Sequence, residues 1–253
     1  MTETGQRYGQ IYTELNAAWA IAKKDIAIYY LKPNIIVSGA LFPLFMFLAF
    51  AVGKPAGPSV MIPGLIAITI LFSASSIEPV SIPIERRMKT FDRLISAPVS
   101  LHAVVLGESL SGFLYSIGIA FVPFIAGLLI FGTPILDVLP LVCGIILTAF
   151  CFATMGTLFA AYPTESPGDI MSMLNMVRLP LIFISGVFIP LESIPSVGQV
   201  LVYFSPLTYG NDLIQAAYQG STHFNPLADI AMLCIFILLF QILANRLYKK
   251  FNE

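Results

Sequence analysis

Six long apolar runs constrain the fold of this chain more than any other feature. They lie at residues 35–52, 60–84, 104–131, 138–161, 170–189 and 227–244. Each run approaches or exceeds the roughly 20 residues that a helix needs to cross the hydrocarbon core of a bilayer. The runs are continuous rather than alternating, so they favour membrane helices over the strands of a membrane β-barrel. The sequence therefore predicts an all-α integral membrane protein with six transmembrane helices.

The composition agrees with lipid as the main solvent of the chain. Of its 253 residues, 57% are hydrophobic and 11% are charged, whereas a soluble domain carries about a quarter charged residues. A net charge of −1 argues against a basic nucleic-acid-binding surface. We therefore expect the chain to contact membrane lipid and not nucleic acid. The three cysteines lie within apolar runs without metal-ligand spacing, and no metal site is expected. We predict one transmembrane domain over 1–253, with a cytoplasmic or interfacial helix at 1–33 and a six-helix membrane bundle at 34–253.

The positions of the lysines and arginines predict the orientation in the membrane. If the N-terminus lies inside, all 13 basic residues except Lys54 and Arg178 fall in inner segments. The excess of lysine and arginine on the cytoplasmic side of membrane proteins then places both termini in the cytoplasm. An even number of spans is consistent with this placement. We expect a multi-pass protein of the cytoplasmic membrane.

An amphipathic segment precedes the first run. Apolar residues recur there at spacings of three and four, among them Ile11, Leu15, Ala18, Trp19 and Ala22, which indicates one face of a helix. Glu14, Lys23, Lys24 and Asp25 are expected on its other faces. The segment is too polar to span the bilayer, and it is typical of a helix in the inner interface with tryptophan as an anchor. A soluble helix packed under the bundle is the alternative.

The stretch between the second and third runs combines charge with a short apolar stripe. Phe91, Leu94 and Ile95 share one face of a predicted helix, which Pro98 ends. Such a helix is suited to the groove of a cytosolic partner, although a solvated loop that only enforces topology has the same charges. The candidate contact residues are Glu85, Arg86, Arg87, Lys89, Thr90, Phe91, Asp92, Arg93 and Leu94.

Polar residues within the apolar runs form a second candidate site. Glu78 lies late in the second run, and Arg178 lies midway through the fifth run, near Asn175. Ionisable groups inside a membrane usually face the bundle interior, where they pair with other groups or line a pathway. Arg178 is expected either to satisfy polar neighbours in the bundle or to contact an anionic group of a substrate. Glu78 is alternatively a residue of the membrane interface.

Several stretches, in this order, resemble the permeases of type-2 ABC exporters. They are ER at 85–86, TFDRL at 90–94 and APVS at 97–100, then IFISGVFIPLESIP at 182–195 and SPLTY at 205–209 with Asp212 beyond. The first three resemble the coupling-helix region of that family. The last two resemble the end of its fifth span, its outer re-entrant loop and the segment before its sixth span. The resemblance covers nearly the whole chain.

Two positions depart from the pattern of the family. The family commonly has glycine before the threonine of the coupling region, where this chain has Lys89, and often arginine where this chain has Gln215. The resemblance further implies that the long segment 190–226 forms re-entrant helices and an outer gate that includes Pro190, Pro206 and Tyr209. A folded outer loop is the alternative for this segment.

The resemblance implies the membrane half of an ATP-driven exporter. Its coupling helix at 85–97 would contact a separate ATP-binding subunit, and a second permease chain, identical or related, would complete the pathway. The chain has no phosphate-binding loop of the G-x-x-x-x-G-K-[ST] type. It is therefore not expected to be an enzyme or to bind a cofactor itself, and ATP and Mg²⁺ would be bound by the partner. A stand-alone secondary transporter or channel is the alternative, although no chain of intramembrane carboxylates or inverted repeats supports it.

Overall fold

The computed structural model describes the backbone of residues 3–30, 41, 43–45, 48, 57–189, 191–193 and 195–252. This part of the chain consists of helices and their connections, without strands. The long helices are α1 (Glu3–Asp25), α3 (Pro58–Ser75), α6 (Leu101–Leu129), α7 (Val138–Ala160), α8 (Pro167–Ile184) and α11 (Pro226–Asn252). The shorter ones are η1 (Ile26–Tyr30), α4 (Glu78–Arg87), α5 (Thr90–Ile95), η2 (Leu191–Ser193), α9 (Ser196–Val202) and α10 (Pro206–Gln219). The expectation of an all-helical fold is confirmed for these residues.

Five helical stretches in the described part are long and apolar enough to cross a membrane. They are Pro58–Arg87, Leu101–Leu129, Val138–Ala160, Pro167–Ile184 and Pro226–Phe251, and they coincide with five of the six predicted runs. Most of the remaining run, 35–52, lies outside the described residues. The count of six transmembrane helices therefore stays a prediction.

The second predicted span is not one uninterrupted helix. It divides into α3 and α4 at Ser76 and Ile77, where the chain bends. Pro79 explains the position of the break, because proline lacks the N–H that would bond to the carbonyl of Ser75, and its ring crowds that carbonyl. In the first turn of α4 the same proline needs no such partner. The bend places Glu78 at the beginning of the new helix.

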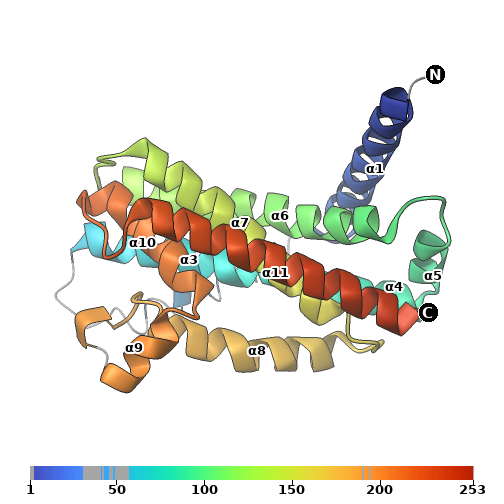
Figure 1. Ribbon diagram of the computed structural model, residues 1–253. Helices are drawn as coiled ribbons and strands as arrows, with labels where there is room; N and C mark the ends of the chain where they lie inside the picture. The colour runs from blue at the N-terminus through green and yellow to red at the C-terminus, as the bar shows by residue number, and fades with distance from the viewer. Residues whose placement is uncertain are drawn as a thin grey trace.

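Helix α3 lies at the centre of the bundle, in contact with α6, α7 and α10 (Figure 1). Its side chains are buried on every side from Ile62 to Ser75, which is expected of a helix that is apolar all round. α8 lies along one side of the molecule and contacts α4 and α7 (Figure 1). The core of the bundle is therefore built around α3, and the other spans present one face to lipid or to other protein.

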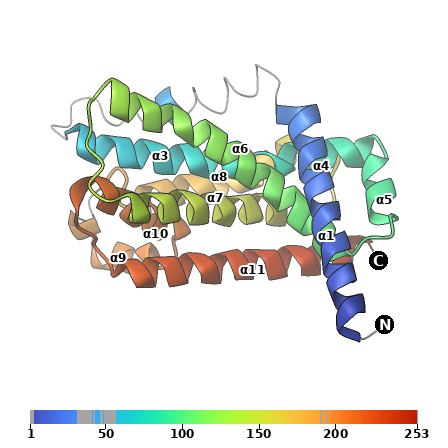
Figure 2. The same ribbon diagram turned by 90° about the horizontal axis from the view of Figure 1, so that it is seen from above.

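Helix α1 crosses the beginning of α6 at one end of the bundle (Figure 2). The two backbones approach closely at Gly107, where a β-carbon would lie 2.8 Å from the carbonyl oxygen of Ala18. Ala18 and Ala22 are buried in this contact, whereas Leu15 and Trp19 are about half exposed. The predicted apolar face is thus divided between the bundle and the surroundings. Asp25, expected on a polar face, is instead completely buried.

The opposite end of the bundle carries α9 and α10 (Figure 1). Pro206 begins α10, where its missing N–H has no cost, and Gly220 ends it with a positive φ of 68°. All residues of α10 from Pro206 to Ile214 are buried. The segment after the fifth span is therefore helical and packed on the bundle, whereas its re-entry into the membrane stays a prediction.

Candidate functional site

The predicted coupling residues form a compact projection at the end of the bundle where α1 crosses α6 (Figures 1 and 2). α4 ends at Arg87, and α5 begins at Thr90 after a sharp turn. Thr90 Oγ1 donates a hydrogen bond to the carbonyl oxygen of Glu85 at 3.2 Å, which ties the two helices across the turn. The exposed side chains of this projection are Arg87, Met88, Lys89, Thr90, Asp92 and Arg93.

Phe91 does not belong to this exposed surface. Its ring is 1% exposed and packs against Tyr248 of α11, with 6.0 Å between the ring centroids. The guanidinium of Arg86 lies 5.2 Å from the Phe91 centroid on the ring face, a cation–π contact. Leu94 is half-buried beside this cluster. Phe91 therefore anchors α5 to the bundle, and Arg93 and Asp92 are left to face outward.

Arg86 connects the projection to the end of α7. Its guanidinium donates to the carbonyl oxygen of Tyr162 and, at 3.3 Å, to that of Ala161. These carbonyls follow the last turn of α7 and have no partner within the helix. A movement of α5 is thereby linked to α7 as well as to α11.

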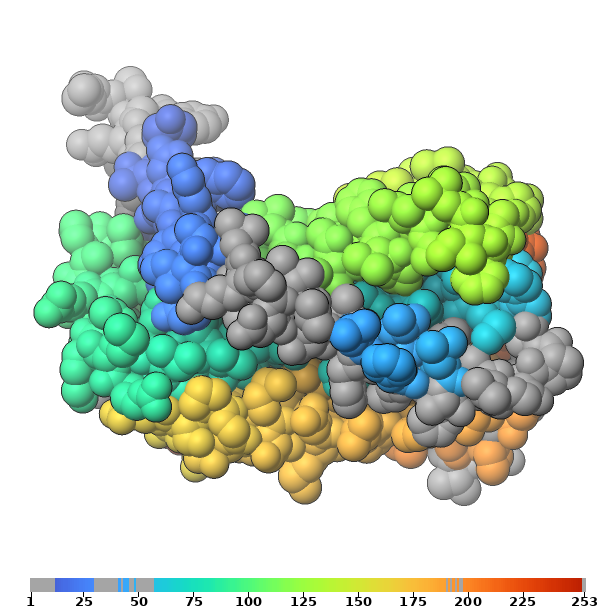
Figure 3. Space-filling model, turned by 180° about the vertical axis from the view of Figure 1, so that it is seen from behind, coloured from blue at the N-terminus to red at the C-terminus, as the bar shows by residue number. Residues whose placement is uncertain are grey.

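Helix α1 contacts both flanks of the projection. Lys24 Nζ lies 2.6 Å from Glu85 Oε1, immediately before the turn, and 3.0 Å from Asp25 Oδ1. Ten residues earlier, Glu14 accepts a hydrogen bond from Ser100, the residue that caps the beginning of α6. Figure 3 shows α1, in blue, against the surface that α4 and α5 form, in blue-green. The segment from Glu85 to Ser100 is thus held on both sides by one helix.

The junction of α1, α4 and α6 holds more carboxylates than cations. Burial by itself would lower the pKa of Lys24. The nearby carboxylates of Glu108, Asp25 and Glu85 have the larger combined effect, and they raise this pKa above its usual value. Burial raises the pKa of Asp25 to about 6, although Lys24 opposes this shift. Glu108 of α6 is 1% exposed. Lys24 is therefore held as a cation, and the charge of the buried Asp25 depends on pH near neutrality.

The second candidate site lies where α3, α4 and α8 meet. Arg178 is completely buried and donates from Nε and Nη2 to Ser75 Oγ, at 3.0 and 2.8 Å. It also donates to Ser76 Oγ at 3.0 Å and to Asn175 Oδ1 at 3.4 Å. Its guanidinium lies 5.3 Å from the centroid of Phe72, over the ring. The arginine thus has polar neighbours inside the bundle, as one of the two expectations stated.

Glu78 is completely buried between α6 and α7. Its Oε1 accepts a hydrogen bond from the backbone N–H of Gly112 at 3.1 Å. A β-carbon at Gly112 would collide with that same oxygen, and one at Gly156 would lie 2.8 Å from Oε2. Two glycines therefore make the space for this side chain. Among the described residues, no ion pair joins Glu78 to Arg178.

The comparison with known proteins identifies the family. The sequence profile described as ABC-2 type transporter matches residues 16–218. The chain belongs to the ABC-2 type transporter family. It is similar to Nodulation protein J of Rhizobium leguminosarum bv. trifolii, with 26% identity over 219 residues, which cover 83% of this chain and 81% of that protein. It is also similar to the inner membrane transport permease YadH of Escherichia coli K12, with 23% identity over 233 residues and 87% of each chain covered. The chain is therefore a multi-pass membrane component of an ABC transporter.

The turn between α4 and α5 of this ABC-2 permease explains why glycine is favoured at the position that Lys89 occupies. This residue has a φ of 59°, the only positive φ of a non-glycine residue in the described part of the chain. Glycine adopts this left-handed conformation without the steric cost that a β-carbon brings. A glycine before the threonine is thus what the α4–α5 turn favours, and Lys89 occupies the same conformation under strain.

The residues predicted to form the outer gate are only partly described. Pro190 lies outside the described residues. Pro206 begins α10, and Tyr209 of α10 donates a hydrogen bond from its hydroxyl to the carbonyl oxygen of Tyr203 at 2.8 Å. The Tyr209 ring packs against Phe224 and Phe236. Pro206 and Tyr209 therefore belong to one packed unit, in which Tyr209 fixes α10 to the end of α9 and to α11.

Sequence reasoning missed the contacts that position these residues. The pair Lys24–Glu85 joins positions 61 residues apart, and no local pattern connects them. The two glycines around Glu78 lie in apolar runs that contain several other glycines. Among these residues, only the role of Ser100 could have been predicted from the sequence, because serine directly before an apolar helical run is a typical N-cap. The missing contacts depend on how helices cross, which the sequence of each helix does not state.

Proposed function

We propose that this ABC-2 permease transmits ATP-driven movement from a separate ATP-binding subunit, which contacts the exposed face of the α4–α5 projection. The observation that carries the proposal is the division of this segment into two sides. Phe91 fixes one side to the bundle, and Arg93, Asp92 and Arg87 are exposed on the other. A short charged helix with a firm attachment is suited to receive force from a cytosolic partner.

The contacts inside the bundle support a route for that movement. α5 is attached to α11 through the Phe91–Tyr248 contact, whereas the end of α4 is attached to α7 through Arg86 and to α1 through the Glu85–Lys24 pair. α4 continues from the projection to Glu78, which contacts α6 and α7. Because packed helices have discrete alternative arrangements rather than continuous ones, a displacement of α4 would switch the bundle between states. Glu78, Asn175 and Arg178 would then line or border the substrate pathway.

The remaining parts of the proposal follow from the family and the charge distribution. A second permease chain, identical or related, completes the transporter, and the two chains enclose the pathway between them. The projection lies on the cytoplasmic side with both termini, because nearly all basic residues fall there. Export of the substrate is the proposed direction, and the outer segment around Pro206 and Tyr209 is the proposed gate.

Co-purification tests the proposal directly. The tagged chain is extracted in mild detergent from its native host, associated proteins are identified, and ATPase activity of the purified material is measured. We expect an ATP-binding subunit in the wild-type sample. Arg93→Glu should remove it, because this change reverses an exposed charge without disturbing the Phe91 anchor. Lys250→Glu, a charge reversal on an exposed residue of α11, is the matched control and should retain the subunit.

Two outcomes would count against the proposal. If Arg93→Glu and Lys250→Glu retain the subunit equally, the projection is not its contact surface. If the wild-type chain purifies without any nucleotide-binding partner and still transports, a stand-alone secondary transporter becomes the better reading. In that case variants of Glu78 and Arg178 would be examined for loss of ion-coupled transport.

A further inference from the structure

An apolar groove lies between the second half of α6 and the first half of α7, at the end of the bundle that carries α10 (Figure 2). Its volume is about 480 Å³, and every residue that lines it is apolar. Ala120 and Leu141 are buried, whereas Phe121, Val142 and Ile146 are about half exposed. The groove therefore has a closed floor between the two helices and walls that reach the surface of the bundle.

The length of the groove matches one leaflet of a bilayer. It lies between two of the helices that are long and apolar enough to cross a membrane. Its lining residues on α7 extend from Val138 to Ile146, a distance of about 12 Å at 1.5 Å per residue. Half of a hydrocarbon core of roughly 30 Å is about 15 Å. An occupant that is apolar throughout and has this length is an acyl chain of a membrane lipid.

The connection between α6 and α7 holds a carboxylate at the mouth of the groove. Ile135 and Val138 line the groove, and Asp137 lies between them. The N–H of Asp137 donates to the carbonyl oxygen of Ala217 in α10 at 3.3 Å. Its Oδ1 accepts a hydrogen bond from the N–H of Leu139 at 3.0 Å, so it is the N-cap of α7. The residue is exposed, and its carboxylate is therefore fixed where a lipid head group would lie.

The charge around the mouth restricts the kind of head group. Residues 94–177 contain no lysine or arginine, so neither helix nor their connection offers a cation to an anionic lipid. An anionic head group would instead lie beside Asp137, a like charge, at an electrostatic cost. A primary ammonium donates charge-assisted hydrogen bonds to a carboxylate, whereas a quaternary ammonium has no N–H group to donate. The mouth therefore favours a lipid whose head group ends in a primary ammonium.

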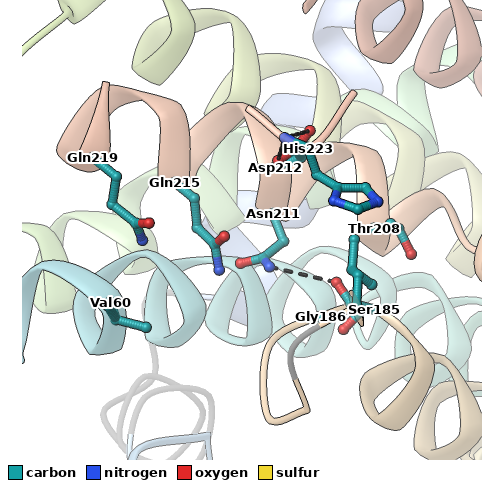
Figure 4. A pocket seen from close by; sticks show the side chains of 10 residues that line it. Val60, Ser185, Gly186, Thr208, Asn211, Asp212, Gln215, Gln219 and His223 are labelled. Carbon is teal, nitrogen blue, oxygen red and sulfur yellow. Dashed lines mark hydrogen bonds between the residues drawn. The ribbon is translucent and has the colours of Figure 1, made fainter. Parts of the chain in front are cut away.

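A second pocket at this end of the bundle is unsuited to an acyl chain. It has a volume of about 210 Å³, and Asn211, Gln215 and Gln219 of α10 extend toward it (Figure 4). Contact with an apolar chain would leave these amides without hydrogen-bond partners, which is unfavourable. The groove between α6 and α7 has no such polar lining.

We propose that the groove between α6 and α7 binds one phosphatidylethanolamine molecule, with an acyl chain in the groove and the ammonium group at Asp137. Lipid tails are as apolar as the groove, so the groove contributes packing contacts, and the head group determines the preference over other lipids. The site lies apart from Glu78 and Arg178, which border the proposed pathway. The lipid is therefore bound as a fixed component of the permease rather than as its cargo.

Lipid binding to the purified chain, without nucleotide or partner subunit, tests this inference independently of the proposed ATP coupling. Delipidated protein in detergent is titrated with dioleoyl phosphatidylethanolamine, phosphatidylcholine and phosphatidylglycerol. Native mass spectrometry gives the dissociation constant of the first bound lipid and the oligomeric state. We expect phosphatidylethanolamine to bind about two- to fivefold more tightly than phosphatidylcholine, the effect of one exposed ion pair. Phosphatidylglycerol should bind more weakly than phosphatidylcholine.

Asp137→Asn tests the head-group contact. Asparagine is as good an N-cap as aspartate, so α7 should begin as in the wild type, whereas the preference for phosphatidylethanolamine over phosphatidylcholine should disappear. Asp169→Asn, the same change at an exposed residue of α8 outside the groove, should keep the preference. Equal binding of the three lipids by the wild type, or an unchanged preference in Asp137→Asn, would overturn the inference.

Val142→Trp tests the groove itself. The indole would occupy the groove from a wall position that is already half exposed, and it should weaken the binding of phosphatidylethanolamine at least about fivefold. Phe121→Ala, which removes part of the opposite wall, should act in the same direction and keeps the test valid if the first variant does not fold. Leu238→Trp, at an exposed position of α11 outside the groove, should bind lipid as the wild type does.

Two results with these groove variants would contradict the inference. The first is lipid binding that neither Val142→Trp nor Phe121→Ala weakens. The second is a wild-type dimer that Val142→Trp separates, because the groove would then be a contact between two chains rather than a lipid site.

Discussion

At the end of the bundle that carries α5, charged side chains make the contacts between helices: Lys24 with Glu85, and Arg86 with the carbonyls after α7. At the opposite end, segment 190–226 contains no lysine or arginine. There the contacts are made by the Tyr209 hydroxyl, the amide of Asn211 and the carboxylate of Asp212, which accepts hydrogen bonds from backbone N–H groups. The charged contacts at the first end fix the position of the α4–α5 segment and leave Asp92 and Arg93 exposed. At the second end, hydrogen bonds to backbone groups hold α10 in place.

The largest expected effect comes from removing the anchor of the charged end. Phe91→Ala should lower the free energy of unfolding by about 3–5 kcal/mol, because it leaves a cavity against Tyr248 and removes the cation–π contact with Arg86. Thermal unfolding in detergent measures the effect. Met88→Ala changes an exposed apolar residue of the same turn and should have little effect. Equal stability of the two variants would contradict the assignment of Phe91 as the anchor.

The connection between the two ends is tested at Gly112. Gly112→Ala places a methyl group against Glu78 Oε1, and we expect a loss of about 1–3 kcal/mol from this overpacking. Gly118→Ala is the matched control in the same helix, since nothing lies within 4 Å of its β-carbon position, and it should be neutral or slightly stabilising. The relevant measurement is the difference in thermal midpoint between the two variants. If Gly112→Ala is tolerated as well as Gly118→Ala, Glu78 is not tightly enclosed.

The charged end should also respond to pH through Asp25. Burial raises the pKa of this carboxyl to about 6, above the value of about 4 in an unfolded chain. The folded state therefore binds more protons between these values, and its stability falls as pH rises from about 4 to 6. Asp25→Asn removes the ionisation, so it should raise the thermal midpoint by a few degrees at pH 7.5, with most of the gain lost at pH 4.5.

The control for this effect is Asp92→Asn, which changes an exposed carboxylate of α5. Its difference from wild type should not vary between the two pH values. A gain for Asp25→Asn that is the same at pH 4.5 and 7.5 would show that side-chain volume, rather than ionisation of Asp25, determines the stability of the junction.

The smallest expected effect concerns the turn between α4 and α5. Lys89→Gly should stabilise the chain by up to about 1 kcal/mol, because glycine adopts the φ of 59° without steric cost. Arg87→Gly, two residues earlier in α4, should instead destabilise by about 1 kcal/mol, because glycine is unfavourable within a helix. Chemical or thermal unfolding in detergent gives the two signs. A loss of stability in Lys89→Gly would mean that the lysine side chain makes a stabilising contact that exceeds the strain.

The sequence by itself determined the class of the protein and the course of its spans. Exposure of long apolar runs to water is unfavourable, and backbone groups in lipid must form hydrogen bonds within the protein. The number and length of these runs therefore restrict the fold to membrane helices. Five of the six predicted runs correspond to helices in the described part of the chain, and the motifs at 85–100 and 182–209 agree with the ABC-2 family match. The break between α3 and α4 was also accessible in principle, since Pro79 acts through its own backbone.

Only the tertiary structure decided what each face of a helix meets. Periodicity placed Phe91, Leu94 and Ile95 on one side of a helix, but it did not state that this side faces the bundle rather than a partner. In the same way, it did not predict that Asp25 is buried or that Lys24 reaches Glu85. The amides of α10 line a pocket only because the beginning of α3 and the end of α8 lie beside them. The physical reason is that helix formation depends on neighbours in the sequence, whereas burial, ion pairing and cavities depend on which helices cross and how closely.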